Sequence, residues 1–292
     1  MTSSPPSAAG KVVIITGASS GIGFEASAKI AAMGSRVVMV ARDVRRGEAA
    51  REAIRKRSGS DAVDLLKCDV SSMAQVRALA DQFRERYDRL DVLVNNAGSV
   101  KRRRETTVDG FEWTFAANYL GHFLLTNLLL DRLRASAPSR IVNVSSEAHR
   151  RATLDFENLH YEKDGYSIPS AYGRSKLAQV VFTVELARRL SGSAVTVNAL
   201  HPGAVATNIW NAARFPWYIR YPIAVARRVI MITPADAADR VVYLATSPEV
   251  EGRTGGYYEK NKEVPPSLAS HDPARGKRLW EESEKLVERS SR

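Results

Sequence analysis

The sequence predicts a single-domain α/β fold, in which helices cover both faces of a doubly wound parallel sheet of about seven strands. Short apolar runs and longer helical patterns alternate from residue 12 to residue 245, apart from one insertion at residues 204–233. The first run, Val12–Thr16, is rich in branched residues, as expected of a strand that is buried on both faces. No internal repeat or linker divides the 292 residues, a length that supports one large core.

The expected elements follow each other through short connections. The expected strands cover residues 12–16, 36–40, 62–67, 92–95, 141–144 and 196–200. The expected helices cover residues 21–32, 45–56, 73–87, 109–135, 170–190 and 234–245. This order predicts parallel strands joined by helical crossovers.

Three segments fall outside the alternation. Residues 1–10 form a Ser/Pro/Ala-rich stretch that we expect to be a disordered tail, which leaves residues 11–292 as one domain. Residues 204–233 form a long insertion rich in Trp, Tyr and Phe and broken by two prolines. Residues 273–289 predict a surface helix with a narrow apolar stripe, which either packs on its own domain, the favoured alternative, or binds a partner helix.

The charge balance favours anionic ligands. Lysine and arginine number 43 against 32 acidic residues, a net charge of +11. This surplus suits a phosphorylated cofactor or an acidic lipid surface, and its scatter along the chain argues against nucleic acid. The single cysteine, Cys68, excludes an internal disulfide and fits a reducing compartment. Without a signal peptide or a long apolar stretch, we expect a cytoplasmic protein with peripheral membrane contact at most.

A glycine-rich turn follows the first strand. In the run VVIITGASSGIG, Gly17, Gly21 and Gly23 remove the side chains that would keep a pyrophosphate from backbone N–H groups and from the start of a helix. The stretch therefore predicts a dinucleotide-binding loop, and the alternative is a purely structural turn.

The residues after the second strand bear on the choice of cofactor. A carboxylate there would bind the ribose 2′-OH of NAD, but the chain has Ala41 followed by Arg42, which could pair with the 2′-phosphate of NADP. NADP(H) is therefore favoured and NAD(H) stays possible. If the strand slips by one residue, Asp43 takes the ribose instead; otherwise Asp43 caps the following helix.

The third and fourth strands end in further candidate cofactor residues. Asp69 could accept a hydrogen bond from the adenine amino group while Val70 packs on the ring, or Asp69 could be an ordinary turn residue. The fourth strand ends in an Asn-Asn-Ala-Gly run, with Asn95, Ala97 and Gly98, whose small side chains leave room for a cofactor.

Tyr172 and Lys176 are candidates for acid–base chemistry. They are four residues apart at the start of a helical pattern and therefore share a face. At an effective dielectric of 20, a cation ~4 Å from the phenol is worth about 4 kcal/mol, near three pKa units. Lys176, alone or aided by an oxidised nicotinamide, could therefore place the pKa of Tyr172 close to neutral. The strand at 141–144 delivers a serine hydroxyl to the same edge of the sheet.

The order of these motifs resembles the short-chain dehydrogenase/reductases from about residue 11 to about residue 258. The resemblance implies a Rossmann-type sheet, NAD(P) in the cleft, and a catalytic tetrad of Asn118, Ser146, Tyr172 and Lys176. Ser146 would hold the substrate oxygen, Tyr172 would exchange its proton, and Lys176 would tune the phenol and bind the nicotinamide ribose. Asn118 would position a water next to Lys176, and Ser145 would be an accessory.

The same resemblance assigns the cofactor-binding residues. These are Thr16, Gly17, Ser19, Ser20, Gly21, Ile22, Gly23, Arg42, Asp69, Val70, Asn95, Ala97, Gly98, Tyr172, Lys176, Pro202, Gly203, Val205 and Thr207. No metal is expected, because none of the five histidines has paired metal-ligand spacing.

Within this family the chain resembles the retinol-dehydrogenase-like branch, which is also similar to the oxidoreductase domain joined to WW domains. The runs RIVNVSS, YGRSKLA and HPG carry this resemblance. It implies carbonyl or alcohol conversion on a retinoid, a lipid aldehyde or a steroid, and the aromatic insertion would overhang this hydrophobic substrate or fill a satellite core. The chain departs from the branch at Ser20, where many NADP-preferring members have a basic residue, and in lacking an N-terminal membrane anchor.

The helices around residues 124–130 and 177–186 are strongly apolar. Their apolar surface either forms a four-helix contact in a homodimer or is buried within one chain, so the oligomeric state stays open. Two other functions also stay open. One is a cofactor-binding regulator that no longer turns over, and the other is an NAD-dependent alcohol dehydrogenase of secondary metabolism.

Overall fold

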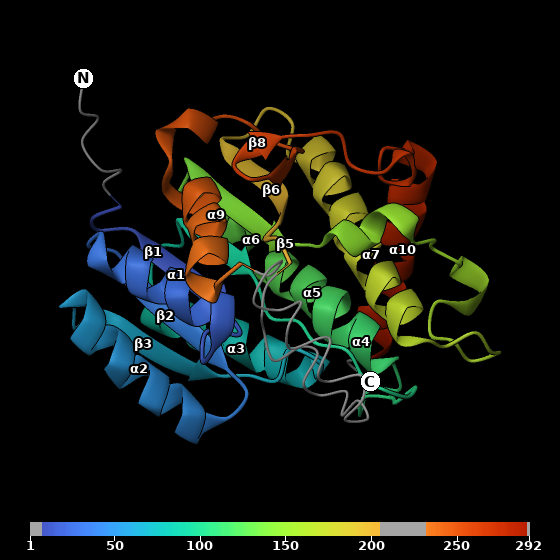
Figure 1. The fold of residues 1–292 in the computed structure, drawn as a ribbon, viewed down its shortest axis with the longest axis horizontal. Helices are drawn as coiled ribbons and strands as arrows, with labels where there is room; N and C mark the ends of the chain where they lie inside the picture. Colours follow the sequence, from blue (N-terminus) through green and yellow to red (C-terminus); the bar gives the residue numbers. More distant parts are fainter. Residues whose placement is uncertain (1–7, 205–231, 291–292) are drawn as a thin grey trace.

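An eight-stranded sheet forms the centre of the fold in this computed structural model, which describes residues 8–204 and 232–290 (Figure 1). The strand order is β3-β2-β1-β4-β5-β6-β7-β8, with all neighbours parallel except β7 and β8. The strands are β1 (Val12–Thr16), β2 (Arg36–Ala41), β3 (Val63–Lys67), β4 (Val92–Asn95), β5 (Ser139–Val144), β6 (Val195–His201), β7 (Tyr257–Glu259) and β8 (Lys262–Glu263). The predicted α/β fold with a parallel sheet is confirmed, with a two-residue antiparallel return added at one edge.

Helices cover both faces of this sheet (Figure 1). One face carries α1 (Gly21–Ala32), α2 (Val44–Ser58) and α9 (Pro234–Thr246). The other carries α3 (Met73–Arg86), the helices between residues 113 and 135, and α7 (Ile168–Arg189). Successive side chains of β1 alternate between the two cores: Val13 and Ile15 pack under α1, whereas Val12 and Ile14 pack under α3.

The amino-terminal boundary of the domain lies earlier than expected. Ala8 is buried, and its carbonyl accepts a hydrogen bond from Ser35 Oγ at 2.7 Å. Gly10 N donates to Gly34 O at 3.1 Å. Residues 8–10 are therefore part of the domain and not of a disordered tail, and residues 1–7 lie outside the described part of the chain.

The single helix predicted over residues 109–135 is wrong. The chain instead forms α4 (Trp113–Phe115), the π-helical turn η1 (Ala116–Leu120), α5 (Gly121–Leu128) and α6 (Leu130–Ala135). The first helix begins only at residue 113 because the Glu112 carboxylate accepts hydrogen bonds from the N–H groups of residues 114 and 115, both at 2.7 Å. The start of α5 touches the turn after β3, where a Cβ on Gly121 would lie 1.9 Å from Val70 O.

The carboxyl-terminal helix α10 (Pro273–Arg289) has the predicted bounds and packs on its own domain. Its Trp280 ring stacks on Phe182 of α7, with centroids 5.9 Å apart, and meets Phe123 of α5 edge-on at 5.1 Å. The Ser283 hydroxyl is hydrogen-bonded to the Tyr119 hydroxyl at 2.7 Å, where both side chains are buried. The apolar face shared by α5 and α7 is therefore covered by a helix of the same chain.

Candidate active site

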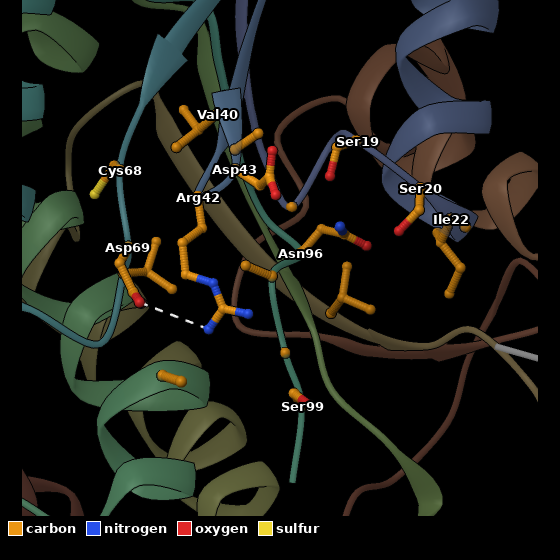
Figure 2. A pocket seen from close by; sticks show the side chains of 18 of the residues that line it. Ser19, Ser20, Ile22, Val40, Arg42, Asp43, Cys68, Asp69, Asn96 and Ser99 are labelled. Carbon is orange, nitrogen blue, oxygen red and sulfur yellow. Dashed lines mark ion pairs between the residues drawn. The ribbon is translucent and has the colours of Figure 1, made fainter. Parts of the chain in front are cut away.

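A cleft of about 470 Å³ opens at the carboxyl ends of the strands. It lies where the strand order reverses between β1 and β4, the point at which open α/β sheets bind ligands. Its walls come from the turns after β1, β2, β3 and β4 and from the start of α7. Figure 2 shows Arg42 reaching toward Asp69 on one side of this cleft, with Ser19, Ser20 and Ile22 on the other.

The glycine loop has the backbone geometry that a phosphate site requires. Gly17 and Gly21 have φ angles of 68° and 60°, which side-chain-bearing residues rarely adopt. A Cβ on Gly17 would lie 2.9 Å from Ala97 Cα, so the loop and the turn after β4 are in direct contact. Ser20 caps α1 with extended backbone and without a side-chain hydrogen bond, so the helix N-terminus has no side-chain acceptor of its own there.

Two predicted cofactor residues are structural supports instead of cleft walls. Thr16 is buried, and its Oγ1 accepts hydrogen bonds from the N–H groups of Asn96 and Ala97, both at 2.9 Å. Asn95 is also buried, and its Nδ2 donates to Asn143 Oδ1 at 2.8 Å, which ties β4 to β5. It is Asn96, which the sequence reasoning left out, that lines the cleft. Its position one residue beyond the strand end was the available signal.

The β2 end of the cleft is basic. Ala41 is buried at the strand end, and Arg42 extends from it to within 3.6 Å of Asp69. Asp43 caps α2 by accepting a hydrogen bond from Arg46 N at 3.0 Å, which agrees with the capping alternative and not with the one-residue slip. Arg46 also lines the cleft, and the sequence reasoning missed it. Its place in the first turn of the helix that follows Arg42, next to the end of β2, was the signal that could have identified it.

Asp69 combines the two roles that were considered for it. Its Oδ1 accepts hydrogen bonds from Ser71 N at 3.0 Å and from Ser71 Oγ at 2.7 Å, which is an ordinary turn geometry. Its other oxygen faces Arg42, and both Asp69 and Val70 line the cleft. Cys68 also lines this wall; burial raises the pKa of its thiol to about 12, so the group stays neutral at physiological pH.

The two serines after β5 are distinguished by their contacts. Ser145 is buried, and its hydroxyl donates to the carbonyl of Lys176 at 2.9 Å, so it anchors α7 to the sheet. Ser146 is half-buried and caps the 3₁₀ turn at residues 147–151. The hydroxyl of Ser146 interacts with the phenol of Tyr172 and acts to lower its pKa. Ser145 and Tyr172 line the cleft, and Ser146 is the serine whose hydroxyl acts on the phenol.

Lys176 lies behind Tyr172 and is almost completely buried. Its Nζ donates to Val144 O at 2.8 Å and to Gln179 Oε1 at 2.9 Å, and it lies 5.6 Å from the centre of the Tyr172 ring. Burial lowers the pKa of Lys176 to about 7. Burial has the opposite effect on Tyr172, whose pKa it raises. The interaction with Ser146 lowers the pKa of Tyr172 but does not offset this rise. In the chain without a cofactor the pKa of Tyr172 is therefore raised and not lowered, because burial outweighs the interaction with Ser146.

Asn118 joins the cleft floor to α7 from the π-helical turn. Its Oδ1 accepts from Ser99 N at 2.8 Å, and its Nδ2 donates to Ser175 Oγ at 2.9 Å. A Cβ on Gly98 would lie 3.3 Å from Asn118 Oδ1 and 3.4 Å from Lys176 Nζ, so both polar groups converge on this glycine. Of the expected tetrad, Tyr172 and Lys176 line the cleft, and Asn118 lies directly behind Gly98 of its lining.

His122, which the sequence reasoning missed, braces this arrangement. The residue is buried, with Nδ1 3.0 Å from Asn118 O and Nε2 3.0 Å from Thr16 Oγ1. Burial lowers its pKa to about 4, so the ring is neutral. Since a carbonyl only accepts, Nδ1 carries the proton and Nε2 accepts from the threonine. A polar residue within an apolar helical run was the available signal.

The last predicted segment is only partly visible. Pro202 lines the cleft, and Gly203 has a φ angle of 97°. Val205 and Thr207, and nearly all of the aromatic insertion, lie outside the described residues.

Comparison with known proteins identifies the family. The sequence profile of the short chain dehydrogenases matches residues 11–215. The chain belongs to the short-chain dehydrogenase family. Retinol dehydrogenase 13 of Mus musculus is 42% identical over 283 residues, which cover 95% of this chain and 84% of that protein. Retinol dehydrogenase 14 of Mus musculus is 42% identical over 288 residues, with 95% and 86% covered.

Solved structures of short-chain dehydrogenases and related proteins share the fold. A crystal structure of an uncharacterized protein from Mycobacterium Paratuberculosis has a TM-score of 0.79 and 33% identity, with 97% of this chain and 95% of that chain covered. The RhlG/NADP active-site complex of Pseudomonas aeruginosa has a TM-score of 0.68 and 29% identity, with 86% and 94% covered. This chain is therefore an NAD(P)-dependent oxidoreductase of the retinol-dehydrogenase-like branch. No helix in its described ranges is both long and apolar enough to span a bilayer.

Proposed function

We propose that this short-chain dehydrogenase uses NADP(H) to interconvert a hydrophobic carbonyl compound and its alcohol, with a retinoid, a lipid aldehyde or a steroid as substrate. The observation that carries the proposal is the position of Tyr172 at one end of the cleft, where the Ser146 hydroxyl acts on its phenol and buried Lys176 Nζ lies 5.6 Å from the centre of its ring. Peripheral membrane contact, a homodimer and a cytoplasmic location stay predictions.

The cleft fits a dinucleotide. Its volume lies within the usual range for cofactor sites, and the positions of Gly17 and Gly23 are so close to neighbouring backbone that only glycine leaves the loop in place. The loop at residues 17–22 would hold the pyrophosphate at the start of α1. Asp69 and Val70 would face the adenine, and Arg42 and Arg46 would pair with a 2′-phosphate.

Several observations support NADP(H) over NAD(H). Ala41 offers no carboxylate to a ribose 2′-OH, and Asp43 is engaged as a helix cap. Arg42 and Arg46 bring two positive charges to the same wall, against one carboxylate from Asp69. A related structure is named as an NADP complex.

Each residue of the site would have a separate role in the reduction of the carbonyl group. Bound NADPH would supply the hydride. The Ser146 hydroxyl would donate a hydrogen bond to the substrate oxygen, and Tyr172 would give that oxygen its proton. Lys176, as a cation, would favour the resulting phenolate, because an ammonium near an anionic oxygen lowers the free energy of its charged form. Asn118 would hold the turn after β4 against α7 and so keep the cleft floor in position.

A hydrophobic substrate is supported by the relatives, which are named as retinol dehydrogenases. The aromatic composition of residues 204–233, directly after Pro202 and Gly203, supports the same class.

The experiment that tests the activity is a screen of purified protein for NADPH and NADH consumption with retinal, medium-chain aldehydes, ketosteroids and quinones. We expect turnover with at least one hydrophobic carbonyl compound. Tyr172→Phe should abolish turnover while NADPH binding, measured by fluorescence, stays within about threefold of wild type. Cofactor binding without turnover by the wild type would favour the regulator alternative.

The cofactor preference needs a separate pair of variants. Arg42→Ala should reduce the NADPH-over-NADH ratio of kcat/KM about tenfold, the lower end for a charged hydrogen bond because the side chain is 65% exposed. Arg45→Ala is the matched control, since Arg45 is an exposed arginine three residues further along, in the first turn of α2, that does not line the cleft. An unchanged ratio in Arg42→Ala, or an equal loss in both variants, would contradict the assignment.

A further inference from the structure

A buried glutamine binds the ammonium of the candidate catalytic lysine. Gln179 lies three residues beyond Lys176 on α7, and only 1% of its surface is exposed. Its Oε1 accepts a hydrogen bond from Lys176 Nζ at 2.9 Å, and the backbone oxygen of Val144 accepts a second at 2.8 Å. A lysine ammonium has three N–H bonds, so these two acceptors leave one for the cleft.

We propose that Gln179 is a positioning residue, which fixes the direction of the Lys176 ammonium and holds its charge in place behind Tyr172. The proposal rests on the proposed function, in which Lys176 acts on Tyr172. Val144 marks the end of β5, so the ammonium is clamped between the sheet and its own helix. Its third N–H bond then has one preferred direction toward the cleft.

The surroundings of Gln179 argue against a purely structural role. Its neighbours Leu177, Ala178 and Val180 are buried and apolar, and an apolar side chain would suit the same position better. The Nε2 of Gln179 is buried without a hydrogen-bond partner among the described residues. An unpaired buried amide group destabilises a fold, and the contact between Oε1 and Lys176 gives a reason for the amide at this position.

Few charged groups compete with Gln179 for the ammonium. In the described ranges 8–204 and 232–290, no carboxylate forms an ion pair with Lys176, whose hydrogen bonds go to uncharged oxygens. The titratable groups that face it are Tyr172 on its own helix and His122 on α5, and the latter ring is neutral. The oxygen of Gln179 therefore contributes directly to the stability of the charged form of Lys176.

The first test measures the titration of Lys176 itself, in cofactor-free protein. Lysine is labelled with ¹³C at Cε, and the Lys176 signal is identified by its absence in Lys176→Met. In Gln179→Met, which keeps the volume and removes the acceptor, we expect the titration midpoint to fall by about one pH unit. In Gln179→Glu, which keeps the shape and adds a negative charge, we expect it to rise by at least about one unit.

The matched control is Thr183→Val. Thr183 lies one turn further along α7, is also buried, and is hydrogen-bonded to the Gln179 carbonyl at 2.8 Å and to Asn143 Nδ2 at 2.8 Å, but not to Lys176. We expect this variant to lose stability and to keep the Lys176 midpoint of the wild type. Equal midpoints in wild type, Gln179→Met and Gln179→Glu would overturn the proposal. If Gln179→Met does not fold, Gln179→Glu decides the matter alone.

The second test is the pH profile of kcat/KM for alcohol oxidation. With less charge on Lys176, the Tyr172 phenolate forms at higher pH, so the rising limb should move to higher pH in Gln179→Met. A merely structural role would lower kcat without moving this limb. The titration of Lys176 needs no turnover. A wild type that is inactive on every substrate would therefore refute the proposed function and leave the Gln179 assignment open to its own test.

Discussion

The close contact at Gly23 gives the most direct prediction about the cofactor loop. A Cβ at this position would lie 2.5 Å from Gly17 O and 2.6 Å from Asn96 Nδ2. To reach ordinary contact at 3.4 Å, the loop or α1 must move by about 0.9 Å. Asn96 cannot yield freely, because its Nδ2 donates to Thr16 O at 2.7 Å. The substitution Gly23→Ala therefore displaces the two cleft walls relative to each other.

The energy of this change follows from two opposing terms. Overpacking of this kind costs roughly 1–3 kcal/mol, and replacing glycine with alanine inside a helix recovers about 1 kcal/mol. We expect a net loss of about 0–2 kcal/mol in the free energy of unfolding. Because the displaced atoms border the expected pyrophosphate site, we also expect NADPH binding to weaken about tenfold, or roughly 1.4 kcal/mol.

The assay combines urea unfolding with fluorescence titration of NADPH. Gly276→Ala is the matched control, because Gly276 is a buried helical glycine of α10 whose Cβ would find its nearest neighbour, in Glu185, at 3.4 Å. This control should be neutral or slightly stabilising and should bind NADPH like the wild type. The reasoning would be refuted if Gly23→Ala matched the wild type in both stability and NADPH affinity.

Three further predictions concern stability, each measured by urea unfolding. Trp280→Ala should lower the free energy of unfolding by about 3–5 kcal/mol, because the ring fills the contact between α10 and α7. The control Lys277→Ala, at an exposed position of the same helix, should leave it almost unchanged, and equal losses in both variants would contradict this packing. Thr16→Val should cost about 1–3 kcal/mol because it removes the acceptor of Ala97 N and one of the two acceptors of Asn96 N, which also donates to Val94 O. Thr246→Val, which only removes a donor to a helix carbonyl, should cost less, and the reverse order would be inconsistent with the network. Acid should destabilise the fold, because the unfolded chain protonates the buried histidines at a higher pH than the folded chain does. Their contribution to the free energy of unfolding is therefore complete above about pH 6.5 and is lost as the pH falls toward about 4. An unfolding free energy that stays constant over this range would show the reasoning to be wrong. The pKa is lowered by burial to about 4 in His122, His160 and His201.

Periodicity predicted the sheet well because most strands are buried on both faces and are therefore continuously apolar. The helix after β4 was predicted poorly for a tertiary reason. Its start depends on the side-chain cap of Glu112, and its π-helical turn coincides with the contact between Gly121 and the turn after β3. Neither feature is visible in the hydrophobic pattern of the segment itself.

In the candidate site too, features fixed by local structure were predicted and features that depend on tertiary contacts were not. The end of β5 was sufficient to bring a serine hydroxyl to the phenol of Tyr172, whereas the choice of Ser146 over Ser145 came from the family resemblance. Strand ends and helical spacing were not sufficient for Lys176, because its long side chain selects acceptors from two elements, Val144 and Gln179. Local spacing therefore predicted which residues meet, but not the direction of the Tyr172 pKa, which depends on burial and on competing hydrogen bonds.

The position of α10 on α7 also has a consequence for biosynthesis. A ribosome makes the chain from the amino end, so the aromatic side chains Phe123 and Phe182 emerge long before Trp280, which covers them. During this interval the apolar face of α5 and α7 is exposed on the nascent polypeptide, because α10 has not yet been made. Holding chaperones should therefore act on this protein late in translation, and early termination before residue 273 should yield aggregates.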